Sequence, residues 1–329
     1  MPLGLFLYRD GDALTPRLEP FEEKALPPGD VTVSVHYSSL NYKDGLAVTG
    51  RGKIVRGDFP FVPGIDLSGL VETSTHPDFV PGDAVVLTGY GTGEQRWGGF
   101  ATHARASGDH LVHVPEGLDL FDAMALGTAG FTAMLAAMAL EKAGVVEGEC
   151  VVTGASGGVG SLAVLLLARS GHRVVASTGK ADAGAYLREL GAIDVIGRDV
   201  LGQGAARPLD TARWSGAVDT VGGATLAALL STMQPHASIA ACGNAQGPEL
   251  NTTVFPFILR GVNVLGVDSN TCLMPLRKEA WARLAREVPR DTLHDLTTTI
   301  ALDDVPAYAA RIVDGEVRGR VVVDLGAAG

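Results

Sequence analysis

Cysteine and aromatic side chains are scarce in this sequence. It has three cysteines among 329 residues, and aromatic residues make up only 6%. Cys150, Cys242 and Cys272 are odd in number and lie far apart, so no disulfide framework is expected. They are also too few for a four-cysteine structural zinc site. This usage is typical of a reducing compartment, and we expect a cytoplasmic protein.

Basic residues are in deficit as well. Lys and Arg number 26 against 37 Asp and Glu, which gives a net charge of −11. Such a surface repels nucleic acid phosphates and anionic membranes, so we expect neither as a general partner. The first residues lack the pattern of a signal peptide. The most apolar run, residues 123–140, is interrupted by Gly127, Thr128 and Gly130, and predicts a buried helix rather than a membrane span.

The sequence changes character near residue 119. Before it, short extended runs at residues 31–35, 84–87 and 111–114 alternate with Pro-Gly turns, which predicts a mostly antiparallel β domain. After it, apolar strands alternate with helices, which predicts a parallel sheet with helices on both faces. The last predicted strand, residues 320–324, is expected to return to the first domain. We therefore expect an α/β protein, with one domain at 1–122 and 270–329 and a second at 123–269.

A glycine-rich turn follows a predicted strand in the second domain. It reads Gly154-Ala155-Ser156-Gly157-Gly158-Val159-Gly160, and an apolar helix comes next. In this order, Gly157 lets the backbone approach a pyrophosphate, Gly160 lets helix and strand pack closely, and the helix N-terminus attracts anions. The turn predicts a dinucleotide site at Ser156, Gly157, Gly158 and Val159. The alternative is a turn that only closes the helix onto the strand.

The end of the next predicted strand distinguishes the two nicotinamide cofactors. An enzyme for NAD carries an acidic residue there, whereas this chain reads Ser177-Thr178-Gly179-Lys180. Ser177 and Lys180 can hold a 2′-phosphate by hydrogen bond and charge, and Arg198 can add a second cation. We therefore predict NADPH as the cofactor. The alternative for Lys180 is a solvated lysine at the start of a helix.

Several longer stretches carry a family resemblance. They are Asn41-Tyr42-Lys43-Asp44, Pro63-Gly64-Ile65-Asp66, residues 127–133, Trp97-Gly98-Gly99 and residues 257–260, together with the glycine turn. On these residues the chain resembles the zinc-free medium-chain dehydrogenases/reductases of the quinone oxidoreductase-like branch, and within it the acrylyl-CoA reductase (NADPH) subgroup. The resemblance covers almost the whole chain. It implies a GroES-like β domain, completed by the C-terminal tail, and a Rossmann domain between.

The resemblance also implies a site without metal. Zinc-containing members of the wider family place a cysteine where Asn41 stands, and a His-Glu pair where Ile65-Asp66 stands. Asn and Ile are not zinc ligands of the kind needed. His103, His110 and His113 lie close in sequence, but no cysteine or carboxylate pattern accompanies them. We interpret them as surface or turn residues.

The implied reaction is NADPH-dependent reduction of the C=C bond of a short enoyl-CoA, acrylyl-CoA to propanoyl-CoA. The catalytic candidates are Asn41, Tyr42 and Asp44. Asn41 would be aimed at the oxygen on which charge develops, Asp44 would orient its neighbours, and the proton would come from Tyr42, Tyr90 or water. We favour a cofactor contact for Tyr42. The further expected cofactor contacts are Thr178, Thr128, Asn244, Ser269 and Arg318. The resemblance implies a basic residue near the last strand at the cofactor, which Arg318 or Arg320 would supply.

Three cations in one short loop can bind the phosphates of CoA. Arg51, Lys53 and Arg56 form this loop, and with Tyr90 they are the expected substrate contacts. The alternative is a solvated loop. The resemblance also implies a homodimer, because related reductases pair through the edge of the Rossmann sheet, where the predicted strand at residues 262–267 should lie. An exposed apolar edge strand would otherwise invite uncontrolled pairing.

Two other functions fit the same residues. The first is an NADPH-dependent reductase of quinones or alkenals. The second is an NADP(H)-binding sensor without turnover, against which Asn41, Asp44, Thr128 and the complete glycine turn argue only weakly.

Overall fold

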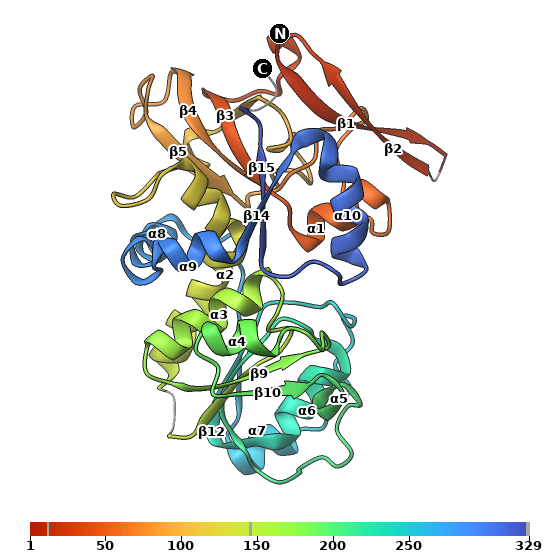
Figure 1. Ribbon diagram of the computed structural model, residues 1–329, viewed down its shortest axis with the longest axis vertical. Coiled ribbons are helices and arrows are strands. Elements are labelled where there is room, and N and C mark those ends of the chain that lie inside the picture. Colours follow the sequence, from red (N-terminus) through yellow and green to blue (C-terminus); the bar gives the residue numbers. More distant parts are fainter. Residues whose placement is uncertain (12, 145–146, 327–329) are drawn as a thin grey trace. The chain divides into compact units, whose positions relative to one another are not determined.

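The computed structural model describes residues 1–11, 13–144 and 147–326. The chain divides into two compact units (Figure 1). Unit 1 combines Met1–Thr128 with the chain from Ser269 onward, and unit 2 is Ala129–Asp268.

Unit 1 is built on an antiparallel hairpin and a seven-stranded sheet. The hairpin pairs β1 (Leu3–Asp10) with β2 (Ala13–Pro20). The larger sheet has the order β14-β15-β3-β4-β5-β7, with β6 also paired to β3. Its strands are β3 (Val31–Ser39), β4 (Asp66–Ser74), β5 (Ala84–Thr88), β6 (His103–Ala106), β7 (Val112–His113), β14 (Thr297–Ala301) and β15 (Arg320–Asp324). The last strand returns as predicted, because β15 pairs antiparallel with β3.

Helices complete unit 1. They are α1 (Tyr42–Thr49), α8 (Met274–Glu287), α9 (Arg290–Asp295) and α10 (Val305–Val313), with short 3-10 turns η1 (Glu23–Ala25), η2 (Gly108–His110) and η3 (Leu302–Asp304). Alternate residues of β3 point into the core, where Val31, Val33 and Val35 pack with Leu67 of β4 and Val85 of β5. This alternation is the pattern from which the strand was predicted.

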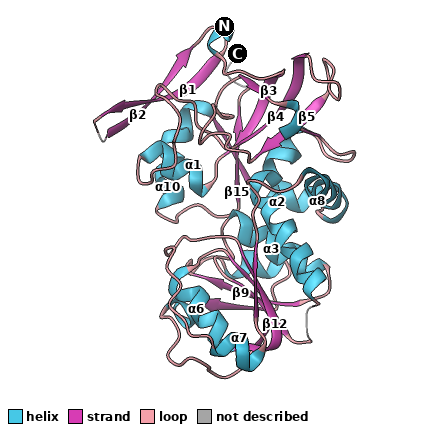
Figure 2. Ribbon diagram, turned by 180° about the vertical axis from the view of Figure 1, so that it is seen from behind, coloured by secondary structure: helices cyan, strands magenta, loops and turns pink. Residues whose placement is uncertain are grey.

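Unit 2 is a six-stranded parallel sheet in the order β10-β9-β8-β11-β12-β13. The strands are β8 (Glu149–Val152), β9 (Arg173–Thr178), β10 (Asp194–Gly197), β11 (Trp214–Asp219), β12 (Met233–Ala241) and β13 (Asn263–Gly266). The helices are α3 (Gly158–Arg169), α4 (Gly184–Glu189), α5 (Asp199–Gly202), α6 (Gly223–Thr232) and α7 (Phe255–Arg260). Figure 2 shows α3 and α6 on either side of the sheet. Numbered along the chain, the strands lie in the Rossmann order 3-2-1-4-5-6, as expected. In such a sheet, ligands bind where β8 and β11 end.

The helix α2 (Leu120–Ala143) covers the most apolar run of the sequence. It is the one helix in the described residues whose length and composition would allow it to cross a membrane, and 83% of its apolar window is buried, as predicted. The helix is interrupted at Gly127, whose φ of 50° and ψ of −156° are not helical.

Candidate functional site

The glycine turn joins β8 to α3 and leaves its outer side open. A Cβ on Gly160 would lie 2.3 Å from the carbonyl oxygen of Gly154, so only glycine allows this close packing. A Cβ on Gly157 would meet nothing nearer than that same oxygen at 3.3 Å. Gly157 is the N-cap of α3 and offers no side-chain cap, so first-turn N–H groups remain available to an anion. The turn therefore has the space and the donors that a pyrophosphate requires.

Two polar side chains that sequence reasoning missed join the ends of β8 and β11. Thr153 donates its hydroxyl proton to the Asp219 carboxylate over 2.6 Å, and the N–H groups of Val221 and Gly222 bind the same carboxylate. Burial raises the pKa of Asp219, while these hydrogen bonds lower it. Asp219 thus fixes the loop at the point where the sheet binds ligands. The signal in the sequence that could have identified Asp219 is an acidic residue at the end of the largely apolar strand β11.

The end of β9 lies directly beside the glycine turn. The hydroxyls of Ser156 and Thr178 share a hydrogen bond of 2.8 Å, and the N–H of Lys180 donates to Thr178 Oγ1 over 3.2 Å. The N–H of Arg198 binds the carbonyl oxygen of Thr178 over 2.9 Å. The structure therefore brings four predicted cofactor residues to one edge of the sheet. Ser177 is also there, but it is only 2% exposed.

Asn244 is the last predicted cofactor residue in unit 2. It is exposed and follows β12, and its Cα lies 3.1 Å from the position of a Cβ on Gly222. Asn244 therefore lies near the loop that Asp219 fixes. The other predicted cofactor residues, Tyr42, Thr128, Ser269 and Arg318, belong to unit 1.

In unit 1, the first turn of α1 is held by a buried carboxylate. Asp44 accepts hydrogen bonds from the backbone N–H of Asn41 over 2.8 Å and from the N–H of Ile65 over 2.9 Å. The N-terminus of α1 is thereby joined to the segment before β4. Through these bonds Asp44 orients its neighbours in the structure, while its part in a reaction stays a prediction.

A second buried carboxylate, Asp66 of β4, collects donors from three segments. Its Oδ2 accepts from Ser39 Oγ at 2.6 Å, from Asn41 Nδ2 at 2.9 Å and from the N–H of Thr128 at 2.9 Å. The hydroxyl of Thr128 donates to Oδ1. Asp66 therefore sits at the N-terminal end of the second part of α2, where an anion is favoured. From the sequence, Asp66 was expected only to stand where zinc-containing relatives have a metal ligand.

Arg320 of β15 completes this buried cluster. Its guanidinium donates to Asn41 Oδ1 over 3.1 Å, and to the carbonyl oxygens of Ala125 at 2.8 Å and Met124 at 3.3 Å. These carbonyls end the first part of α2, so a cation and an anion stabilise the two sides of the break at Gly127. Arg320 is 2% exposed, whereas Arg318 is exposed.

The orientation of the Asn41 amide follows from these charges. Its Nδ2 faces Asp66 at 2.9 Å and Asp44 at 3.1 Å, while its Oδ1 faces Arg320. The reverse orientation would place an oxygen against two carboxylates, which is unfavourable. Both N–H bonds of the amide are thus directed at carboxylates and not left open for the substrate oxygen at which Asn41 was expected to be aimed. In this arrangement the amide links α1 to β4.

Burial perturbs the charged members of the cluster. It raises the pKa of Asp44 to about 7, with a further rise from the Asp66 charge and an opposing effect of the hydrogen bonds. Burial lowers the pKa of Arg320, while Asp66 and Asp44 raise it. Two carboxylates and one guanidinium are therefore buried together, and their charges affect the pKa values of Asp44 and Arg320.

This donor set does not fit zinc. Asn41 presents N–H groups rather than a thiolate, Ile65 has no ligand atom, and the Asp66 carboxylate already accepts from three segments.

Elsewhere in the described residues, ligand atoms of Glu23, Glu72 and His103 lie within 4.8 Å of one another on the surface. These two carboxylates, from η1 and β4, lie close to the partly exposed His103 only in space, so no sequence pattern indicated them. His110 and His113 instead stack on Tyr90 and Phe79.

Tyr90 is held firmly by its surroundings. Its φ of 54° is unusual for a residue with a side chain. Its ring stacks on His110 with centroids 4.3 Å apart, and its hydroxyl donates to the carbonyl oxygen of Cys272 over 2.9 Å. With its proton engaged in this bond, Tyr90 is a weaker candidate for the proton donor than Tyr42, which is 39% exposed.

Among the described residues, two cations of the basic loop lie near carboxylates and the third does not. Arg51 forms an ion pair with Asp314, and Arg56 lies 3.8 Å from the buried carboxylate of Glu94, which also binds Lys43. Lys53 is exposed and forms no ion pair with the described residues. Lys53 is therefore the member of the loop whose charge is most available to an incoming anion.

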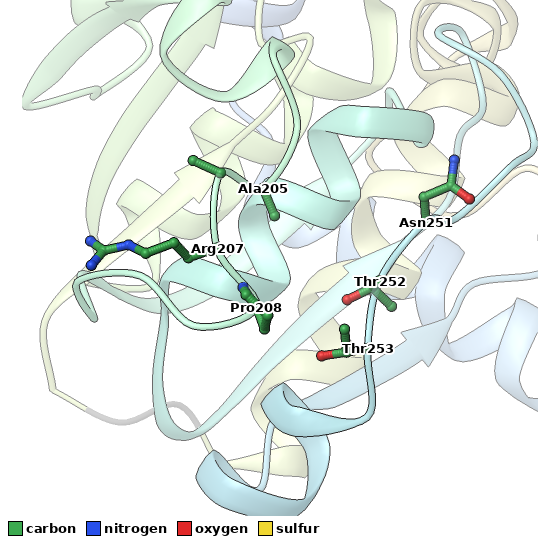
Figure 3. A pocket seen from close by; sticks show the side chains of 7 residues that line it. Ala205, Arg207, Pro208, Asn251, Thr252 and Thr253 are labelled. Carbon is green, nitrogen blue, oxygen red and sulfur yellow. The ribbon is translucent and has the colours of Figure 1, made fainter.

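A shallow pocket elsewhere in unit 2 contains none of the predicted site residues. It is lined by Ala205, Ala206, Arg207, Pro208, Asn251, Thr252 and Thr253 (Figure 3). The Arg207 side chain points away from Asn251, and it pairs with Asp210.

Comparison with known proteins agrees with this architecture. Residues 27–116 match the alcohol dehydrogenase GroES-like domain, and residues 158–288 match the zinc-binding dehydrogenase domain. The chain belongs to the medium-chain dehydrogenase/reductase family. Within this family, it is 50% identical over 304 residues to acrylyl-CoA reductase AcuI of Ruegeria pomeroyi, which covers 92% of each protein.

Two solved structures of family members are also similar. The yhdH oxidoreductase of Salmonella enterica in complex with NADP is 49% identical, with a TM-score of 0.96 over 99% of this chain and 100% of that one. The yhfP protein of Bacillus subtilis with NAD bound is 41% identical, with a TM-score of 0.94 over 98% and 99%. The same fold thus accepts either cofactor in this family.

Proposed function

We propose that this protein is an NADPH-dependent reductase of the C=C bond of a short enoyl-CoA, converting acrylyl-CoA to propanoyl-CoA without a metal. The observation that carries this proposal is the 50% identity with an acrylyl-CoA reductase over 92% of both chains. The donor set around Asn41 and Asp66, which does not suit zinc, supports a reaction that needs none.

The chemistry of unit 2 supports the cofactor. The open turn at Gly157 and the first-turn N–H groups of α3, at Gly158 and Val159, would hold the pyrophosphate. Lys180 and Arg198 would hold the 2′-phosphate, for which an acidic residue at this strand end would be unsuitable. The expected contacts of Ser177, Asn244, Thr128, Ser269 and Arg318 with the cofactor remain part of this proposal.

When bound, NADPH supplies the hydride that adds to the β-carbon of the enoyl thioester. The residues of unit 1 provide the rest. Asp44, Asp66 and Arg320 fix Asn41 and with it the start of α1, where Tyr42 is exposed. Tyr42 would contact the cofactor, and the proton for the α-carbon would come from Tyr42 or from water. A Tyr42→Phe variant separates the two roles of this residue, because loss of a proton donor lowers kcat, whereas loss of a cofactor contact raises the KM for NADPH.

The substrate phosphates would meet the loop that contains Arg51, Lys53 and Arg56. In a protein of net charge −11, a local group of cations is needed to attract the polyanionic CoA. Lys53 carries most of this attraction because its charge has no carboxylate partner among the described residues.

A steady-state comparison tests the proposed function. Purified protein is supplied with NADPH and one of acrylyl-CoA, crotonyl-CoA or a small quinone, and NADPH oxidation is followed. We expect the highest kcat/KM with acrylyl-CoA. Turnover of quinones alone would make the protein a quinone reductase, and NADPH binding without turnover of any acceptor would make it a sensor.

We also propose a cytoplasmic homodimer that pairs through β13. This strand is at the edge of its sheet. Apolar side chains are exposed on β13, on α7 and on the residue before α7: Val264, Phe255, Ile258, Leu259 and Val254. Light scattering should give twice the mass of one chain. Ile258→Glu should yield monomers, whereas Val200→Glu, at an exposed valine of α5, should not. A monomeric wild-type protein would refute the dimer.

A further inference from the structure

The glycine at the end of β9 has an unusual environment. The three atoms nearest to a Cβ built on Gly179 all belong to the side chain of Arg198: Cδ and Nε at 2.8 Å and Cζ at 3.1 Å. The guanidinium group of Arg198 therefore lies against the backbone of Gly179, in the space that any other residue would fill. Gly179 was not among the residues predicted to bind the cofactor.

The backbone of Arg198 is fixed by a hydrogen bond, whereas its side chain is exposed and available to bind a ligand. Its backbone N–H donates to the carbonyl oxygen of Thr178, which fixes the residue beside the strand end. Its side chain is exposed and has no hydrogen bond or ion pair with any described residue. Its packing against Gly179 therefore helps to define where the guanidinium lies.

The position of this charge matters because it is next to the other cofactor residues. Thr178 binds the hydroxyl of Ser156 in the glycine turn and the N–H of Lys180. A phosphate on the adenine ribose near this strand end would meet Arg198 together with Lys180. Arginine binds phosphate with two parallel N–H donors, so its orientation affects affinity as well as its charge.

We infer that Gly179 is a specificity-determining residue for NADP(H) over NAD(H), because its missing side chain lets Arg198 lie where the guanidinium can bind the 2′-phosphate. This inference rests on the proposed cofactor. It is consistent with a family in which one similar structure holds NADP and another holds NAD. The choice of cofactor must then depend on individual residues rather than on the fold.

Alanine at this position should change the packing of Arg198 without straining the backbone. Gly179 does not have a left-handed φ, so alanine can adopt its backbone conformation. The added methyl group would displace a flexible side chain and no backbone atom among its three nearest neighbours. Gly202→Ala is the matched control, because Gly202 ends the helix that Arg198 precedes, has no left-handed φ, and a Cβ there would have no neighbour within 4 Å.

The test measures dissociation constants of NADPH, NADH and 2′,5′-ADP for the full-length protein by fluorescence and calorimetry. We expect Arg198→Ala to weaken NADPH about tenfold to a hundredfold, the range for a lost hydrogen bond to a charged group, and to leave NADH nearly unchanged. Gly179→Ala should weaken NADPH and 2′,5′-ADP about threefold to tenfold, again without an effect on NADH. Gly202→Ala should match the wild type.

The double variant decides whether Gly179 acts through Arg198. If it does, Gly179→Ala has no further effect in the Arg198→Ala background. A further loss there, equal losses for NADPH and NADH, or no change in Gly179→Ala would overturn the inference while the proposed function stands. A wild-type protein that binds NADPH no more tightly than NADH would overturn the cofactor assignment and the inference together.

Discussion

The buried position of Asp44 predicts an unusual dependence of stability on pH. Its pKa is raised to about 7 in the folded protein, whereas an unfolded chain has the ordinary value near 3.9. The folded state therefore binds this proton more tightly, and the stabilising contribution is fully present below about pH 4 and is lost as the pH rises to about 7. Each pH unit in this window costs up to about 1.4 kcal/mol. Between pH 5 and pH 8 the free energy of unfolding should fall by about 2–3 kcal/mol through this one group.

Urea unfolding at several pH values and constant ionic strength measures this effect. In Asp44→Asn the group cannot titrate, so this part of the pH dependence should disappear, even if the variant is less stable at every pH. Asp58→Asn is the control, because Asp58 is exposed and makes no hydrogen bond or ion pair with the described residues. The reasoning is refuted if Asp44→Asn retains the slope of the wild type, or if the slope of the wild type is absent or reversed.

Three further outcomes are expected. Gly127→Ala should lower the free energy of unfolding, measured with urea, by about 3 kcal/mol or more. Alanine is strained at this φ, and its Cβ would lie 2.7 Å from side-chain atoms of Arg320 and Asp66. A change below about 1 kcal/mol would contradict this explanation. Lys53→Glu should raise the KM for acrylyl-CoA several-fold at low salt and less at high salt, and an effect independent of salt would argue against a charge interaction. Prolonged treatment with a chelator should leave NADPH-dependent turnover unchanged, and activity restored by added zinc would show that a metal takes part.

Much of unit 2 was predictable because its signals are local. Strands buried on both faces appear as short apolar runs, and the glycine turn identifies the first strand and helix by itself. The hairpin of β1 and β2 was missed because β2 is largely exposed, contains Pro16 and Pro20, and lacks an apolar alternation. The helix α1 was missed because its eight residues, which include Gly45, carry only a weak helical pattern.

The buried cluster could not be predicted from the sequence for a different reason. Arg320 and Asn41, which share a hydrogen bond, are 279 residues apart, and Asp66 and Thr128 are 62 apart. Neither periodicity nor sequence spacing can predict such pairs, because they become neighbours only when unit 1 folds. The resemblance indicated Asn41 and Asp44, but only the structure shows that Asp66 and Arg320 hold the Asn41 side chain.

The place of β15 within its sheet has a consequence for the order of folding during synthesis. This strand lies between β14 and β3 and carries Arg320, yet Arg320 is translated 195 residues after Ala125, the α2 residue whose carbonyl oxygen it binds. Unit 2 is one continuous segment, so it can fold on the ribosome as soon as residue 268 has emerged. Until β15 arrives, Asp44 and Asp66 lack their counter-charge and β3 has an open edge. The nascent first unit is therefore the part of the protein that most needs protection by chaperones.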